Sequence, residues 1–169
     1  MKKPIYFYVL LVLSSLSTLS SLYAIFVSKH AVNIQKTGDP NIDKFSTESL
    51  TFIEKSGAIS RGGLAIGVTV LSLLLLAATW YFLLKRDIPK ASYLYLGQMV
   101  ANLLYALYSF VAFRNIAMSV FTTDLGRSTT DMSLMVGAGM AILVFLIFAG
   151  IIVFKLFRYQ NAQEEAAEI

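Results

Sequence analysis

The sequence predicts an all-α integral membrane protein, a bundle of four antiparallel transmembrane helices with both termini in the cytoplasm. Three observations lead to this prediction. Of the 169 residues, 57% are hydrophobic and only 14% are charged, whereas soluble domains carry about 25% charged residues. The charged residues leave four long uncharged stretches, and basic and aromatic residues gather at the ends of these stretches. We expect residues 1–169 to form a single transmembrane domain.

The four uncharged stretches are the predicted spans, because a charged side chain at the centre of a bilayer is costly. They cover residues 4–28, 62–84, 91–113 and 132–154. A helix rises about 1.5 Å per residue, so each stretch reaches roughly 34 to 38 Å and exceeds a hydrocarbon core of about 30 Å. A buried helix of a soluble protein rarely needs this uncharged length, and here it occurs four times.

The first span has an alternative interpretation. Lys2 and Lys3 precede an apolar run, as in a signal peptide, and Thr18 and Ser20 are small residues near a possible cleavage point. Cleavage would leave three helices and an outer N-terminus. Because apolar residues resume over 22–27, a full span is favoured.

The connections are an outer loop over 29–61, an inner hairpin over 85–90, an outer segment over 114–131 and a cytoplasmic tail over 155–169. The outer loop is shorter than the roughly 40 residues that a domain needs to fold without disulfides or metal. After a turn at 38–41, the sequence of this loop predicts a short amphipathic helix, which either covers the bundle or docks a partner. The hairpin is short, so spans two and three are neighbours, and Asp87 or Pro89 can start the third span.

Arg114 is the most ambiguous charge in the sequence, because apolar residues continue after it. In the simpler interpretation its side chain reaches the outer interface and the following residues lie along the membrane surface. If the helix instead continues, Arg114 needs a partner.

Orientation follows from the density of Lys and Arg. With the N-terminus inside, inner and outer segments carry equal numbers of cations, but the inner ones are concentrated in short pieces, above all in the 85–90 hairpin. Positive-inside reasoning therefore places both termini in the cytoplasm. We expect a bacterial plasma membrane from the compactness and composition of the chain.

Two spans carry polar faces. Span one has six hydroxyl residues within positions 14–21, among which Ser14, Ser17 and Ser21 are candidate ligand-binding or partner-binding residues. Span three carries a stripe at i, i+4, i+7 and i+11, formed by Gln98, Asn102, Tyr105 and Ser109. An amide that faced acyl chains would leave its polar atoms unpaired, so we expect this stripe to face inward. It would serve interhelical hydrogen bonding, or recognition of a buried ligand or subunit.

Small residues predict where helices meet. Gly63 and Gly67 form a GxxxG motif at the outer start of span two, and Gly137 and Ala141 belong to a small-residue patch of span four at the same depth. The two spans would cross there, or these faces would serve oligomerisation.

The lack of ionisable residues in the spans and of cysteine in the chain limits the functions that we expect. The four spans contain no ionisable Asp, Glu, Lys, Arg or His, the chain has no cysteine, and its one histidine, His30, lies in the outer loop. We therefore expect no metal, no cofactor, no nucleic acid and no catalytic residues. If the protein has an enzyme site after all, a polar cluster of His30, Asp39 and Asp43 in the outer loop is the candidate for it.

The predicted function is a non-enzymatic subunit or accessory of a membrane assembly, which binds the lipid bilayer and another membrane protein or copies of itself by helix packing. The alternative is an oligomeric transporter or channel component for a neutral or weakly polar solute.

Overall fold

The computed structural model describes residues 5–27 and 38–167, and this part of the chain is helical and contains no strand. It has five helices, which are α1 (Ile5–Phe26), α2 (Pro40–Ser60), α3 (Gly63–Leu84), α4 (Ile88–Val120) and α5 (Asp124–Ala167). Four of them, α1, α3, α4 and α5, are long and apolar enough to cross a membrane. The prediction of an all-α membrane protein with four candidate spans is thereby confirmed.

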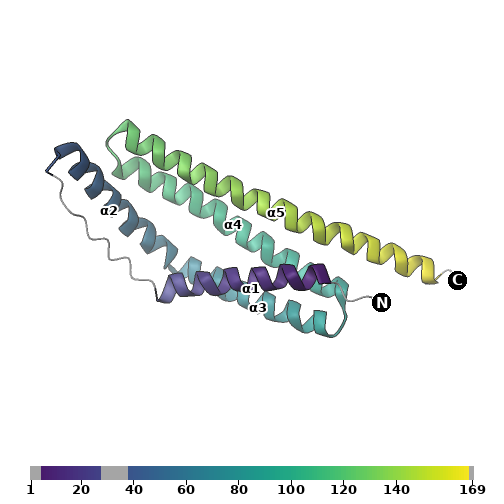
Figure 1. Cartoon of the computed structure of the whole chain (residues 1–169). Coiled ribbons are helices and arrows are strands. Elements are labelled where there is room, and N and C mark those ends of the chain that lie inside the picture. The colour runs from purple at the N-terminus through teal and green to yellow at the C-terminus, as the bar shows by residue number, and fades with distance from the viewer. Residues whose placement is uncertain (1–4, 28–37, 168–169) are drawn as a thin grey trace.

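Helix α4 lies between α3 and α5, and α1 packs against α3 (Figure 1). The α3–α4 connection and both chain ends lie at one end of the molecule, which we call the hairpin end. The α4–α5 connection and the start of α2 lie at the other, which we call the turn end. The functional features described below are distributed between these two ends.

The hairpin end is closed by a connection of three residues, 85–87. The Arg86 amide donates to Leu83 O and the Asp87 amide to Phe82 O, the pair of bonds that typically ends a helix around a left-handed residue. Arg86 takes that conformation, with φ of 63°. Asp87 then caps α4 by accepting from the Lys90 amide, as the sequence predicted, and its carboxylate pairs with Lys90 Nζ at 2.9 Å.

The structure at the turn end differs from the predicted outer segment. Instead of a separate segment over 114–131, α4 continues to Val120 and α5 begins at Asp124. The physical reason is that Arg114 has a partner in Asp131. Arg114 Nε lies 2.8 Å from Asp131 Oδ1, and Arg114 Nη2 donates to Asp131 Oδ2 at 3.3 Å. The structure therefore follows the alternative in which the helix continues. Spans three and four are helical well beyond their predicted bounds.

The turn itself is tight. The Gly126 amide donates to Thr123 Oγ1 and Arg127 Nε donates to Phe121 O at 2.7 Å. A Cβ on Gly126 would lie only 2.9 Å from the Phe121 ring, so a larger residue would push this ring away.

Helix α2 replaces most of the predicted outer loop and is longer than the short helix expected there. Asp39 accepts from the Asn41 amide at 2.9 Å and so caps its start. The helix packs along α4, where Phe45 and Phe52 lie against the Phe121 ring at centroid distances of 5.8 and 5.7 Å. His30 lies outside the described residues, so the expected cluster with Asp39 and Asp43 cannot be placed.

Glu48 fixes α2 to the turn. It is 9% exposed, and its Oε1 accepts from the Thr122 hydroxyl at 2.6 Å and from the Thr122 amide at 3.3 Å. The second carboxylate oxygen, Oε2, is buried without a partner in the described part of the chain. A buried carboxylate is costly unless hydrogen-bonded, so the Thr122 bonds hold Glu48 in place.

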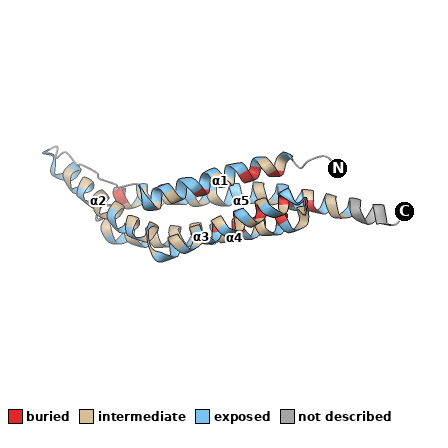
Figure 2. Cartoon of the chain, turned by 90° about the horizontal axis from the view of Figure 1, so that it is seen from below, coloured by how far each residue is buried: buried red, intermediate tan, exposed pale blue. Residues whose placement is uncertain are grey.

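The apolar core lies toward the hairpin end, where buried residues gather (Figure 2). It consists of Phe7, Leu10, Leu11, Leu76, Leu83, Ala91, Tyr95 and Ile152. Helix α1 contributes only from its first half to this core, so its second half is left with few apolar contacts to the other helices.

Candidate functional site

Side chains in the first half of α1 attach this helix to the rest of the bundle. The Phe7 ring lies edge-on against the Tyr95 ring at 5.7 Å, and the Tyr8 ring lies 5.9 Å from the Trp80 ring. Two turns after Phe7, the Ser14 and Tyr95 hydroxyls share a hydrogen bond of 2.8 Å, and the Trp80 indole donates to Ser15 at 3.3 Å.

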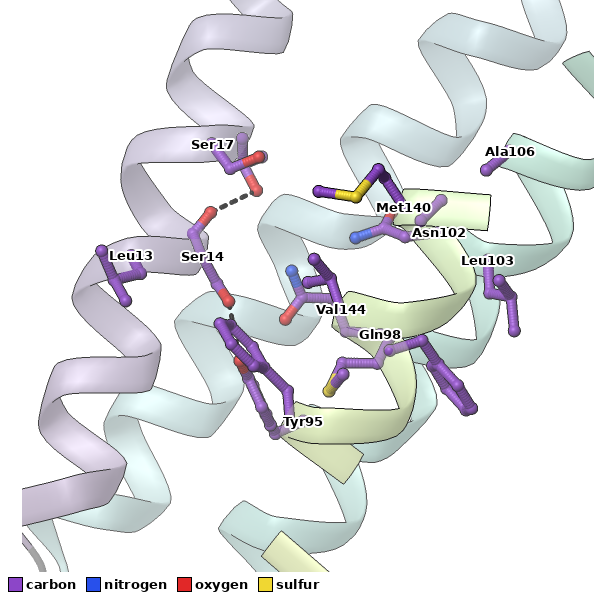
Figure 3. A pocket seen from close by; sticks show the side chains of 15 residues that line it. Leu13, Ser14, Ser17, Tyr95, Gln98, Asn102, Leu103, Ala106, Met140 and Val144 are labelled. Carbon is purple, nitrogen blue, oxygen red and sulfur yellow. Dashed lines mark hydrogen bonds between the residues drawn. The ribbon is translucent and has the colours of Figure 1, made fainter. Parts of the chain in front are cut away.

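Beyond these contacts a groove opens between α1, α4 and α5, which we call the central groove (Figure 3). Its volume is about 550 Å³, within the range of about 300–1,000 Å³ that is usual for small-molecule sites. Its lining is Leu13, Ser14, Ser17 and Thr18 from α1, Tyr95, Gln98, Met99, Asn102, Leu103 and Ala106 from α4, and Met140, Ala141, Val144, Phe145 and Phe148 from α5.

A second cavity of about 370 Å³ lies between α1, α3 and α4 and shares Ser17, Thr18 and Asn102 with the central groove. We call it the side cavity. Its polar feature is a hydrogen bond of 2.7 Å from the Ser72 hydroxyl to Asn102 Oδ1. The two spaces therefore meet at Asn102, near the middle of the uncharged stretch over 91–113.

All four residues of the predicted span-three stripe line spaces between helices. Gln98 lines the central groove, Asn102 lines both the groove and the side cavity, and Tyr105 lines the side cavity. Ser109 lines a third cavity of about 380 Å³ between α4 and α5, which Tyr105 also lines. Gln98 is buried and Tyr105 and Ser109 are partly buried, whereas Asn102 is exposed at the open groove.

The hydroxyls of span one are divided between two roles. Ser14 and Ser17 line the central groove, and Ser17 and Ser21 line the side cavity. Thr18 and Ser21 donate to backbone carbonyls one turn earlier in their own helix, which satisfies these hydroxyls without a partner helix.

The small residues of spans two and four do not pack against one another as the sequence predicted. A Cβ added at Gly63, Gly67 or Gly137 would meet nothing within 4 Å, because α4 separates α3 from α5 (Figure 1). The expected crossing of spans two and four at these residues is therefore not formed within the described chain. Ala141 lines the central groove instead.

Sequence reasoning missed several polar residues of the site. Tyr95 precedes Gln98 by one turn on the same face of α4, and Thr18 follows Ser14 by one turn, so helical spacing alone would have found both. Ser72 shares a face of span two with Thr69 and Thr79, but its role depends on the partner Asn102 and was missed.

The polar groups of the central groove can form hydrogen bonds with an occupant. They are hydroxyls and carboxamides from α1 and α4. The arrangement can donate and accept hydrogen bonds in an otherwise apolar space.

The family described as Domain of unknown function (DUF8777) matches residues 1–165. The chain belongs to the DUF8777 family. Its match covers α1 to α4 and nearly all of α5, so the groove, the turn and α2 all lie within the region that matches DUF8777. No curated protein and no solved structure matches the chain.

Proposed function

We propose that the protein is a non-enzymatic subunit or accessory of a membrane assembly, which packs its helices against another membrane protein or against copies of itself. The observation that carries this proposal is the open space at Gly63, Gly67 and Gly137, where an added Cβ meets nothing. Small residues allow helix backbones to approach closely in lipid, where packing drives association. These faces have no partner within the described chain.

The α3 face extends beyond its two glycines. Leu71 and Leu74 continue it at i+8 and i+11 from Gly63, and both are exposed. The resulting stripe, which runs over Gly63, Gly67, Leu71 and Leu74, has small residues at the start of α3, next to the end of α2, and large ones closer to the hairpin end. A neighbouring helix would cross closely at the glycines and pack its side chains around the leucines.

The proposed orientation places the hairpin end in the cytoplasm. Lys85, Arg86 and Lys90 lie in or beside the hairpin, and Lys155 Nζ lies 5.7 Å from the Tyr6 ring of α1. Cations from the hairpin and from α5 therefore gather at the same end. This supports cytoplasmic termini by the positive-inside rule, in what we propose is a bacterial plasma membrane.

The experiment is cross-linking in native membranes followed by purification in a mild detergent. Wild-type protein is expected in cross-linked species larger than the monomer, and Gly67→Leu is expected to reduce them strongly because a leucine side chain separates the helices. Gly97→Leu and Gly150→Leu are matched controls, since a Cβ at either position also meets nothing but neither belongs to a GxxxG motif.

Monomer alone in the wild type would contradict the proposal. Equal loss of the larger species in Gly67→Leu and in both controls would also contradict it, because the α3 stripe would then have no special role.

A second candidate function is transport of a neutral solute, which the adjacent central groove and side cavity favour, because they share Ser17, Thr18 and Asn102 in their linings. Uptake of glycerol into proteoliposomes, blocked by Ser17→Trp or Asn102→Trp, would support it. Liposomes that remain as impermeable as protein-free ones would exclude it for that solute.

A further inference from the structure

Gln98 carries an unusual polar atom. Its side chain is 2% exposed, yet its Oε1 has no hydrogen-bond partner within the described residues. A buried polar group left unpaired is destabilising. Gln98 lines the central groove, and its amide points toward the space beside α1 (Figure 3). A group that occupies this space is therefore the available partner.

The neighbouring acceptors are already engaged. The Ser14 hydroxyl is bonded to Tyr95, and Asn102 Oδ1 accepts from Ser72. The amide nitrogen of Asn102 faces the same space one turn along α4 (Figure 3). The groove thus presents an acceptor at Gln98 and a donor at Asn102. A hydroxyl group matches this pair, because it both donates and accepts.

The groove has the shape and lining of a site for a hydrocarbon chain. It follows α4 from Tyr95 to Ala106, a length of roughly 16 Å at about 1.5 Å per residue. Its volume is about 550 Å³, and apart from the polar residues its lining is apolar, with Leu103, Val144 and Phe148 among its side chains. An alkyl or isoprenoid chain matches an elongated apolar space of this kind.

The groove opens sideways. Leu13 on α1 and Met140 on α5 both line it, and they are 49% and 57% exposed. An occupant can therefore enter from the lipid. Because Asn102 lies near the middle of its uncharged stretch, the polar pair lies deep in the bilayer, where a charged headgroup would be costly. These facts select a neutral ligand.

We infer that the central groove binds a neutral hydrocarbon that carries a hydroxyl group, of the long-chain or isoprenoid alcohol class. The hydroxyl lies between the amides of Gln98 and Asn102, and the chain lies along the apolar side chains of α5. This binding uses a face different from the α3 stripe and does not depend on assembly.

The experiment uses the full-length protein in phosphatidylcholine nanodiscs. The probes are a long-chain alcohol with a photoreactive diazirine in its chain and the matching methyl ether, which cannot donate a hydrogen bond. After illumination, labelled peptides are quantified by mass spectrometry. The alcohol is expected to label the α5 segment over 140–148 about tenfold more than the ether, the factor that one hydrogen bond of about 1.4 kcal/mol provides.

Variants link this preference to the amides. Gln98→Leu is expected to reduce the alcohol-to-ether ratio to near one. The matched control Gln160→Leu, on the last turns of α5 outside the groove, is expected to leave the ratio unchanged. Ala106→Phe fills one end of the groove two turns from Gln98 and is expected to reduce labelling by both probes, which tests the site even if Gln98→Leu does not fold.

Equal labelling by alcohol and ether in the wild type would overturn the inference, because the groove would then be an unselective lipid or water space. An unchanged ratio in Gln98→Leu would overturn it as well. Cross-links from the groove to another polypeptide would show that a protein segment fills it. The alcohol-to-ether ratio does not depend on the oligomeric state, so the assembly proposal is tested separately.

Discussion

The hairpin end and the turn end of the molecule are built differently. At the hairpin end, apolar side chains from α1, α3, α4 and α5 bury one another in a single cluster. Toward the turn end, hydroxyls and amides line three cavities, and polar bonds hold the helices together. Bulky side chains fill the space between helices, whereas serine and threonine satisfy themselves on their own backbone and leave the space open. The difference separates a packed anchor from a binding region.

The largest expected effect comes from removing the anchor. Phe7→Ala deletes a fully buried ring that contacts Tyr95. We expect a loss of about 2–3 kcal/mol in the free energy of unfolding, below the roughly 3–5 kcal/mol of soluble cores because lipid surrounds the helix with equally apolar groups. Denaturation by SDS in mixed micelles measures it. Leu16→Ala, on the exposed side of α1, is the control, and an equal loss there would show that the two ends do not differ in packing.

The second effect tests the polar attachment of α2. Glu48→Ala removes the acceptor of both Thr122 bonds, and we expect a loss of about 1–2 kcal/mol with earlier exchange of α2 amides in hydrogen–deuterium exchange. Glu48→Gln keeps an acceptor oxygen and should lose less. Glu54→Ala, on the exposed side of α2, should change neither quantity. Unchanged exchange in Glu48→Ala would mean that the aromatic contacts alone hold the helix.

A smaller effect is expected inside the bundle. Ser72→Ala removes the 2.7 Å bond to Asn102, and hydrogen bonds between membrane helices contribute about 0.6 kcal/mol on average. The same SDS titration should show a loss of this size, while Ser21→Ala, which removes only a bond within its own helix, should show less. A loss as large as that of Phe7→Ala would refute the division into a packed end and an open end.

The smallest effect lies in the hairpin turn. The hydrogen bond from Lys90 keeps the pKa of Asp87 below its ordinary value. The stability that Asp87 contributes is therefore present above the pKa of the unfolded chain and is lost as the pH falls through the lowered pKa. Asp87→Asn should lower stability slightly at neutral pH and match the wild type in acid, as pH-dependent unfolding would show. A larger deficit in acid would contradict this sign.

The spans were predictable because each obeys a local rule. The uncharged stretches are bounded by charged residues that can be found without knowledge of the fold. Among these bounding residues are Arg61, Lys85, Lys90, Arg114 and Lys155. The burial of Gln98 was predictable for the same reason, since helical spacing and the cost of an unpaired amide suffice. Asn102 lines the groove but is exposed.

Features that depend on distant pairs were not predictable. Arg114 marked the expected end of span three, but Asp131, 17 residues later, neutralises it and lets α4 continue. Glu48 could not be distinguished from the other acids of the loop by sequence, because its hydrogen-bond donor Thr122 lies 74 residues away. The glycines predicted a crossing without indicating that α4 would separate the two helices. Each of these outcomes is decided by a contact that the sequence does not encode locally.

The backbone of Arg86 has a further consequence for how the chain is inserted during synthesis. A left-handed conformation costs a side-chain-bearing residue about 1–2 kcal/mol, and glycine would avoid that cost. Glycine would also remove one of the two cations, Lys85 and Arg86, from this three-residue connection, and positive charge in short connections guides the orientation of the neighbouring spans. If the proposed orientation holds, the strained arginine exchanges a little folded-state stability for a cytoplasmic positive charge.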